Sequence, residues 1–348
     1  MKILSIALFN NPKGQGGIES FNRALKYMFG KKIKIIVYNV KKQKSIYEVE
    51  DIIKVGSASI FFRFINRILK NKLREYLLIK KVKKIAPNMI IFSYPYEVNI
   101  LSNIKSKKIL VQHTSWSKYL DIYCDGGRLN TALKENLDYF IALSPYDREI
   151  FCKGLNLKKE RVKVIRHSSG IELLRNKKQS NKKLIMIARI DNNSKRFDLA
   201  IKVMRKLPDY TLDIYGNGTD VEYCKKIIEE KKINNVFLRG STNNVQEKLD
   251  ESGIFIMTSD YEGYPISIIE AMRRGLPIVL RNTFDSARDI VIDNGVLLEK
   301  EWNEDKFIEA VKKIYDNYEY YSENSKKLGE RYSLEVIKKE WDKLFKGE

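Results

Sequence analysis

Residues 262–279 have the sequence EGYPISIIEAMRRGLPIV, and the apolar run Ile254–Thr258 comes just before them. Proline suits the first turn of a helix, because it lacks an amide hydrogen that would have no acceptor there. Pro265 therefore predicts a helix start, and Gly275 with Pro277 predicts the helix end. A second apolar run follows. The segment thus predicts a strand, a polar loop, a helix and a second parallel strand, as in α/β proteins.

Two glutamates make this segment a candidate functional site. The start of a helix after a parallel strand presents unpaired backbone amides and the positive end of the helix dipole, which together favour a phosphate ligand. Glu262 precedes the predicted helix and Glu270 lies in its second turn, so both can face such a ligand at different depths. For either glutamate alone, a capping or solvated position is the simpler interpretation.

The whole pattern resembles glycosyltransferase family 4, whose members share E-x7-E in the setting E-G-[FY]-P-x-x-x-x-E-A-M-x-x-G-x-P-[IV]-V. The resemblance extends over almost the whole chain. It implies a GT-B fold and a retaining hexosyltransferase that takes a hexose or N-acetylhexosamine from a nucleotide sugar, with UDP as the expected nucleotide. It also implies that Glu262 orients the donor sugar and that Glu270 holds the ribose hydroxyls. The other donor-binding positions that it implies here are Tyr264, Pro265, Ile266 and Ser267.

Two cations in the second half complete the implied catalytic set. Arg189 ends an apolar run and Lys195 follows in the next loop, at positions that resemble the family's diphosphate-binding Arg and Lys. Fixed positive charges near a leaving diphosphate stabilise the charge that develops as the glycosidic bond breaks. Arg196 is adjacent, so either residue 195 or 196 could reach the phosphate. The sequence contains no D-x-D metal motif, and we expect metal-independent chemistry without a cofactor.

Glycine turns and one histidine supply the remaining candidates. Gly16 and Gly17 follow the first apolar run and resemble the family's N-terminal G-G-[IVA]-E loop, while Gly216 and Gly218 resemble a turn that borders the nucleotide. His113 closes another apolar run and matches a family histidine near the donor sugar. A structural histidine is the alternative. We assign no chemistry to the second histidine of the chain.

Apolar runs alternate with helical periodicity along the chain, which predicts two doubly wound parallel sheets. The resemblance adds that they face a central cleft. The expected domains are an acceptor-binding domain at 1–175, a nucleotide-sugar domain at 176–325 and, at 326–348, a helix that crosses back to the first domain. The polar segment Glu172–Lys183 is the predicted linker. Ten strands are expected, at Ile3–Phe9, Ile33–Val40, Met89–Tyr94, Ile109–Gln112, Tyr139–Leu143, Leu184–Ala188, Thr211–Tyr215, Val236–Arg239, Gly253–Thr258 and Pro277–Leu280.

The net charge of +21 is concentrated in the first half, where residues 1–175 carry 34 Lys and Arg against 14 Asp and Glu. Nucleic acid or an anionic membrane would each attract such a surface. The segment Ile60–Lys84 predicts one or two basic amphipathic helices. Its apolar face could pack on the sheet, or it could lie on lipid headgroups. We expect a cytoplasmic protein, peripheral on the inner face of the membrane, with a lipid-linked glycan acceptor used in cell-surface assembly.

Three other functions fit the sequence less well. A dinucleotide oxidoreductase would need G-x-G-x-x-G after its first strand, and Glu19 occupies the third glycine position. A nucleic-acid-binding function would account for the positive charge of the first half but not for the E-x7-E helix. A sugar-nucleotide epimerase of the same fold would not be expected to concentrate charge in one half. The three cysteines, Cys124, Cys152 and Cys224, have no metal-ligand spacing.

Overall fold

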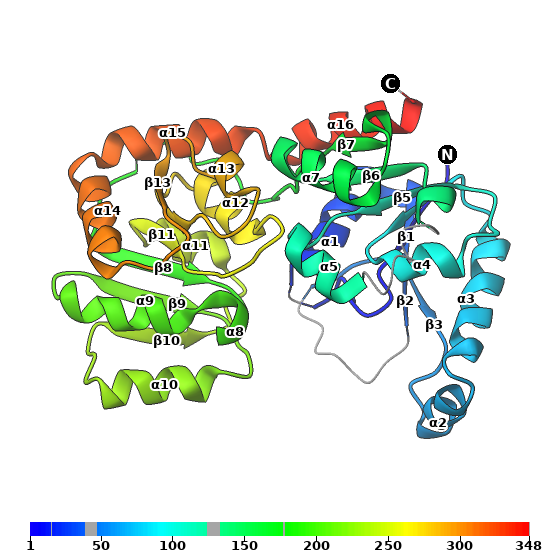
Figure 1. Ribbon diagram of the computed structural model, residues 1–348, viewed down its shortest axis with the longest axis horizontal. Helices are drawn as coiled ribbons and strands as arrows, with labels where there is room; N and C mark the ends of the chain where they lie inside the picture. The colour runs from blue at the N-terminus through cyan, green and yellow to red at the C-terminus, as the bar shows by residue number, and fades with distance from the viewer. Residues whose placement is uncertain (15, 39–46, 124–132, 177, 348) are drawn as a thin grey trace. The chain divides into compact units, whose positions relative to one another are not determined.

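The structure is a computed structural model that describes residues 1–14, 16–38, 47–123, 133–176 and 178–347 (Figure 1). The chain divides into two compact units, Met1–Ile165 and Arg166–Glu348. In its described residues, the segment Glu172–Lys183 contains no helix and is irregular until the strand that begins at Lys183. Cys124 lies outside the described residues.

Within the described residues, the first unit contains a seven-stranded parallel sheet in the order β3-β2-β1-β4-β5-β6-β7. This order has the first strand inside the sheet and strands added on both sides, which is the doubly wound arrangement. The strands are β1 Ile3–Ile6, β2 Ile33–Tyr38, β3 Ile52–Val55, β4 Met89–Phe92, β5 Lys107–Val111, β6 Tyr139–Ala142 and β7 Val162–Val164. The helices are α1 Gly17–Phe29, α2 Ile60–Ile68, α3 Lys72–Ile85, α4 Pro95–Ile100, α5 Trp116–Tyr123 and α7 Pro145–Leu155.

The described part of the second unit repeats this plan with six parallel strands in the order β10-β9-β8-β11-β12-β13. The strands are β8 Lys183–Ile187, β9 Thr211–Tyr215, β10 Val236–Gly240, β11 Ile254–Met257, β12 Ile278–Arg281 and β13 Gly295–Leu298. The helices are α8 Asn192–Lys195, α9 Phe197–Val203, α10 Val221–Glu230, α11 Val245–Asp250, α12 Ile266–Arg273, α13 Ala287–Ile290, α14 Glu304–Asp316, α15 Tyr318–Glu330 and α16 Leu334–Lys346. The prediction of two doubly wound sheets is confirmed.

Each unit has its own hydrophobic core. Residues of β1, β4, β5 and β6 pack with helix residues such as Leu78 and Phe151 in the first unit. A separate cluster around β8, β9 and β11 includes Phe197 and Phe307 in the second. Strands buried on both faces are typical of parallel sheets covered by helices on each side. The opening apolar run thus begins with a buried strand, as predicted, but the strand ends at Ile6 and Phe9 is exposed.

The final helix α16 forms close to the expected position, and its residues Ile337, Trp341, Leu344 and Phe345 are buried. It belongs to the second compact unit. Its return to the first domain stays a prediction, as does the central cleft.

The basic segment Ile60–Lys84 forms two helices, α2 and α3. The break lies at Lys70 and Asn71, which have positive φ values of 45° and 69°. Figure 1 shows α2 at one end of the first unit, beside α3. Among the described residues, no helix is both long and apolar enough to cross a bilayer.

Candidate functional site

The candidate site of the second unit lies where β8 and β11 end. These strands are parallel neighbours, so their carboxyl ends meet at the same edge of the sheet. The following loops are joined by hydrogen bonds. The amide of Asp260 donates to the carbonyl of Ser194 at 2.9 Å. The Thr258 hydroxyl donates to the carbonyls of Lys195 and Arg196 at 3.0 and 2.9 Å. The backbone around Lys195 is therefore fixed against the loop that carries Glu262.

Lys195 and Glu262 are brought into direct contact, although 67 residues separate them in the sequence. The Lys195 ammonium lies 2.6 Å from Glu262 Oε1, and only 17% and 10% of the two side chains are exposed. The Ser259 hydroxyl donates to the same oxygen at 2.7 Å. A charge-assisted hydrogen bond is stronger than a neutral one, and partial burial limits its screening by water. One catalytic candidate of each charge therefore occupies this edge.

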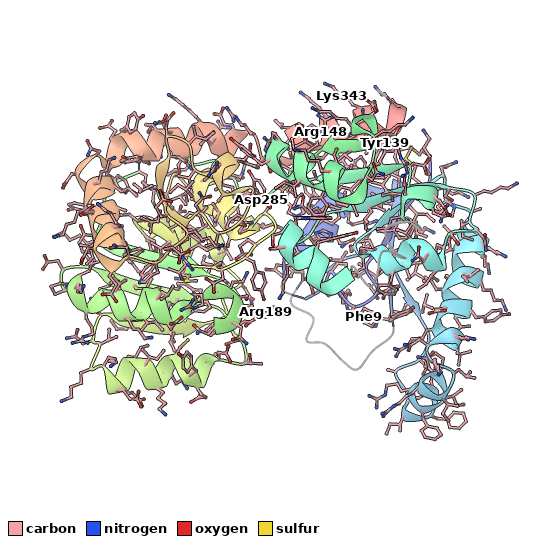
Figure 2. All side chains as sticks on the ribbon, viewed as in Figure 1. Phe9, Tyr139, Arg148, Arg189, Asp285 and Lys343 are labelled. Carbon is pink, nitrogen blue, oxygen red and sulfur yellow. The ribbon has the colours of Figure 1, made fainter. Side chains whose placement is uncertain are left out.

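The other two cations differ in their surroundings. Arg196 donates to Asp198 Oδ1 at 3.0 Å and to Asp260 Oδ2 at 3.2 Å. The hydrogen bond to Asp198, and to a smaller extent that to Asp260, raises the pKa of Arg196 above its ordinary value. Arg196 is therefore held by two carboxylates, those of Asp198 and Asp260, whereas Lys195 contacts the carboxylate of Glu262. Arg189 lies at the surface (Figure 2), with 74% of its side chain exposed and Asp191 3.4 Å away.

Helix α12 begins at Ile266, with Pro265 as the residue just before it. The first amides of a helix have no acceptor within that helix, so those of Ile266 and Ser267 are suited to an anionic ligand. Ile266, Ser267 and Glu270 are partly exposed, whereas Ile268, Ile269, Ala271 and Met272 are buried. Residues spaced by four share a helix face. Glu270 thus lies on the same accessible face as the start of the helix.

The Tyr264 side chain points into the protein. Its hydroxyl lies 3.1 Å from Asp289 Oδ2 and 2.5 Å from the hydroxyl of Tyr332. Arg166 holds both oxygens of Asp289, at 2.7 and 2.8 Å. Burial raises the pKa of Tyr264 well above its ordinary value, so the hydroxyl stays protonated. The side chain therefore stabilises the loop, and any donor contact of Tyr264 must come from its main chain.

Gly216 and Gly218 are required by the packing of neighbouring loops. A Cβ atom at Gly216 would lie 1.9 Å from the carbonyl oxygen of Ala188, and one at Gly218 would lie 1.9 Å from that of Ile190. Gly216 also has a φ of 149°. Only glycine fits such close backbone approaches. These residues place the β9 turn against the loop that carries Arg189.

The first unit brings its own candidates close together. Gly16 precedes α1 with a φ of 147°, and Gly17 is its first residue. The ring of His113 lies 5.2 Å from that of Phe21, one turn into the same helix, in an edge-to-face contact. The glycine loop and His113 therefore share one region at the carboxyl edge of the first sheet.

Comparison with known proteins agrees with this architecture. Residues 172–331 match the family model described as glycosyl transferases group 1. A poly(glycerol-phosphate) alpha-glucosyltransferase of Bacillus subtilis is 35% identical over 153 residues, which are 42% of this chain and 22% of that enzyme. An uncharacterized glycosyltransferase of Haemophilus influenzae is 27% identical over 327 residues, 86% of this chain and 91% of the relative. The chain thus matches only about a fifth of the first relative's length but most of the second.

A mutant of Staphylococcus aureus TarM, solved with fondaparinux, alpha-GlcNAc-glycerol and UDP, has a similar structure. The TM-score is 0.79 at 17% identity, over 99% of this chain and 100% of that chain. The fold is GT-B. With the family match and the relatives, it supports a GT-B glycosyltransferase. The expected fold class is confirmed, whereas the assignment to family 4 and the retaining mechanism stay predictions.

The match to the family model includes the candidate residues of the second unit and excludes His113, Gly16 and Gly17. Sequence reasoning missed two side chains of this GT-B site, Thr258 and Ser259. Both are buried, and their hydroxyls contact Lys195 and Glu262 as described above. The available signal was their position, since two hydroxyl residues follow β11 directly and precede Glu262.

Proposed function

We propose that this protein is a retaining, metal-independent glycosyltransferase that moves a hexose or N-acetylhexosamine from a UDP-sugar to a lipid-linked or polysaccharide acceptor. The observation that carries the proposal is the meeting of Lys195 and Glu262 at the end of β11, just before the start of α12. A cation, a carboxylate and the first amides of a helix together suit a sugar diphosphate.

The roles of the residues follow from their positions. Lys195, Arg189 and the amides of Ile266 and Ser267 bind the diphosphate, and Lys195 is the less exposed of the two cations. Glu270 binds the ribose hydroxyls from the accessible face of α12. Glu262 hydrogen-bonds the donor sugar, and His113 contributes from the first unit near the glycine loop. Gly216 and Gly218 border the nucleotide.

The proposed reaction is a substitution on one face of the sugar. The acceptor hydroxyl attacks the anomeric carbon as the bond from that carbon to the diphosphate oxygen breaks. The proton of the acceptor passes to the departing phosphate oxygen, so the products are the glycosylated acceptor and the free nucleoside diphosphate. Lys195 and the helix amides stabilise the negative charge that grows on the leaving group. The name of the Bacillus subtilis relative specifies an alpha product, which retention yields from an alpha-linked donor.

We expect the purified protein to hydrolyse a UDP-sugar slowly without an acceptor, and to do so equally well in excess EDTA. The reason is that Lys195, Arg189 and the helix amides supply the positive charge that a bound metal would otherwise supply. The measurement is release of sugar from radiolabelled donors, with and without chelator. Loss of turnover in EDTA that magnesium or manganese restores would refute metal independence alone. A changed sugar still attached to its nucleotide would instead indicate an epimerase.

The expected nucleotide is uridine diphosphate. UDP occurs in the similar TarM structure, and such donors predominate in the family that the sequence resembles. Thermal unfolding with UDP or GDP tests the prediction, since a ligand that binds only the folded state raises the unfolding temperature. UDP should raise it more than GDP. Stabilisation by GDP alone would show that the nucleotide is misassigned.

We further propose that helix α2 holds the enzyme on the inner face of an anionic membrane, where a lipid-linked acceptor is available. Its apolar residues are exposed, with Ile60 at 78%, Phe61 at 74%, Phe64 at 63% and Ile68 at 62%. Exposed cations lie beside them at Arg67, Lys70 and Lys72. An apolar face bordered by basic residues is typical of helices that lie in a lipid interface. Each engaged Lys or Arg adds about 1 kcal/mol of headgroup attraction.

Liposome co-sedimentation tests this surface. Wild-type protein should bind vesicles that contain anionic lipid at low salt, and should be released by high salt. Reversal of Arg67, Lys70 and Lys72 to glutamate, with Phe61→Ser and Phe64→Ser, should abolish binding. Arg74 is kept because it packs over the rings of Tyr38 and Phe62.

The control carries three reversals elsewhere on the same unit, at the exposed residues Lys31, Lys32 and Lys105. It should bind vesicles nearly as well as the wild type. Equal loss in both variants would mean that overall charge, rather than α2, determines binding. No preference for anionic vesicles would favour a soluble acceptor.

A further inference from the structure

Glu262 Oε1 accepts hydrogen bonds from two side chains at once. Lys195 Nζ lies at 2.6 Å and Ser259 Oγ at 2.7 Å. The carboxylate neutralises the same ammonium that, under the proposed function, binds the donor diphosphate. An ammonium has three hydrogens and could contact both anions. Two anions that share one cation in a partly buried site nevertheless repel each other, because water screens them poorly there.

We propose that the Lys195–Glu262 ion pair is a contact of the free enzyme that the donor breaks. Lys195 then turns to the diphosphate. Glu262 keeps its hydrogen bond to Ser259 and, in place of the one from Lys195, accepts a hydrogen bond from a hydroxyl of the donor sugar. Ser259 is thus a positioning residue, which holds the carboxylate after Lys195 has left it. This inference rests on the proposed function. It adds that Glu262 and the donor diphosphate compete for Lys195.

The surrounding structure lets this exchange proceed through side chains alone. The Thr258 hydroxyl ties down the carbonyls of Lys195 and Arg196, and the Thr283 hydroxyl binds the carbonyl of Ser259 at 2.7 Å. The Ser286 hydroxyl donates to the carbonyl of Gly263 at 2.5 Å. The backbone on both sides of the ion pair is therefore fixed. A lysine side chain has several rotatable bonds, so its head group can move while its Cα atom stays in place.

Binding of UDP alone, measured by calorimetry, tests the competition without any turnover. Removal of the competing carboxylate in Glu262→Gln should tighten UDP binding by about threefold to fivefold, the upper part of the range for exposed ion pairs. Lys195→Met should weaken it. In the Lys195→Met background, Glu262→Gln should change UDP affinity by less than about twofold, since the cation for which it competes is absent.

Unchanged or weaker UDP binding by Glu262→Gln would overturn the inference, and so would an equal gain in the Lys195→Met background. Both results leave the proposed function intact. A wild-type protein that binds neither UDP nor another nucleoside diphosphate would refute the proposed function itself. Thermal unfolding of each variant without ligand verifies that it is folded.

The role of Ser259 has its own readout. Ser259→Ala should lower kcat by about tenfold while UDP affinity changes by less than about twofold, because the hydroxyl positions only the carboxylate that contacts the sugar. When Glu262 is already Gln, the added Ser259→Ala should lower kcat much less than it does in the wild type. Additive losses would instead mean that Ser259 acts through the fold rather than through Glu262.

Discussion

Turnover by the Glu262→Ala variant should fall by about 100-fold or more, without a loss of affinity for UDP. Glu262 is proposed to orient the donor sugar, and a small misplacement of the reacting carbon has effects of this size. Its carboxylate contacts Lys195 and Ser259 in the free protein, so no contact with the nucleotide is removed. Single-turnover rates and UDP binding by calorimetry measure the two effects separately.

Glu270→Ala should show the opposite pattern. Loss of a charged group that binds the ribose should weaken UDP binding by about 1.5–3 kcal/mol. Glu229, an exposed glutamate on α10, provides the control, and its replacement by alanine should alter neither quantity. Equal effects of the Glu262 and Glu270 variants on UDP affinity would contradict the roles assigned to them.

Arg166→Ala should lower the free energy of unfolding by about 2–4 kcal/mol, slightly less than the loss typical of a fully buried broken pair. Both oxygens of Asp289 accept from Arg166, and the side chains are 20% and 12% exposed. Burial acts to lower the pKa of Arg166, but the contact with Asp289 outweighs it and raises that pKa. Removal of the arginine leaves a poorly solvated carboxylate next to Tyr264. Urea unfolding monitored by circular dichroism measures the loss.

Arg288 lies on α13 one residue before Asp289 and is exposed. Its replacement by alanine should change the free energy of unfolding by less than about 0.5 kcal/mol. Similar losses in the two variants would mean that net charge, rather than the specific pair, stabilises this region. The second change Asp289→Asn removes the carboxylate charge that Arg166→Ala leaves unpaired. Recovery of the free energy of unfolding in this double variant would support the role of the pair.

The interior of both sheets could be predicted from the sequence, because buried parallel strands are continuous apolar runs. All ten expected strands form. The three strands that were not expected, β3, β7 and β13, each lie at an edge of a sheet. They are short and partly exposed. These three edge strands have only three or four residues each, so they do not stand out from the loops around them. The edge strand β10, with five residues, was expected.

The candidate site was predicted in part. The E-x7-E pattern and the family resemblance named Glu262, Glu270, Arg189 and Lys195 as candidates, but not which of them touch. The contact between Lys195 and Glu262 depends on the adjacency of β8 and β11, which strand order alone determines. The same limit hid the pairing of Arg166 with Asp289, which lie 123 residues apart. The sequence also did not show that the Tyr264 side chain points into the protein. Tyr264 lies in a loop, where no periodic pattern indicates whether a side chain is buried or exposed.

The joined loops after β8 and β11 have an evolutionary consequence. The groups proposed to break the glycosidic bond rest on two adjacent strands, and hydrogen bonds from Thr258 and Asp260 hold them together. The turns after β9 and β10 carry exposed polar residues, among them Asn217 and Ser241, whose side chains bind each other at 2.7 Å. If these turns border the nucleotide as proposed, substitutions in them can change the preferred nucleotide while the reactive groups keep their places. Under the proposed function, substitutions that accumulate in these surface turns change the nucleotide that is accepted, and the groups that break the bond do not have to be rebuilt.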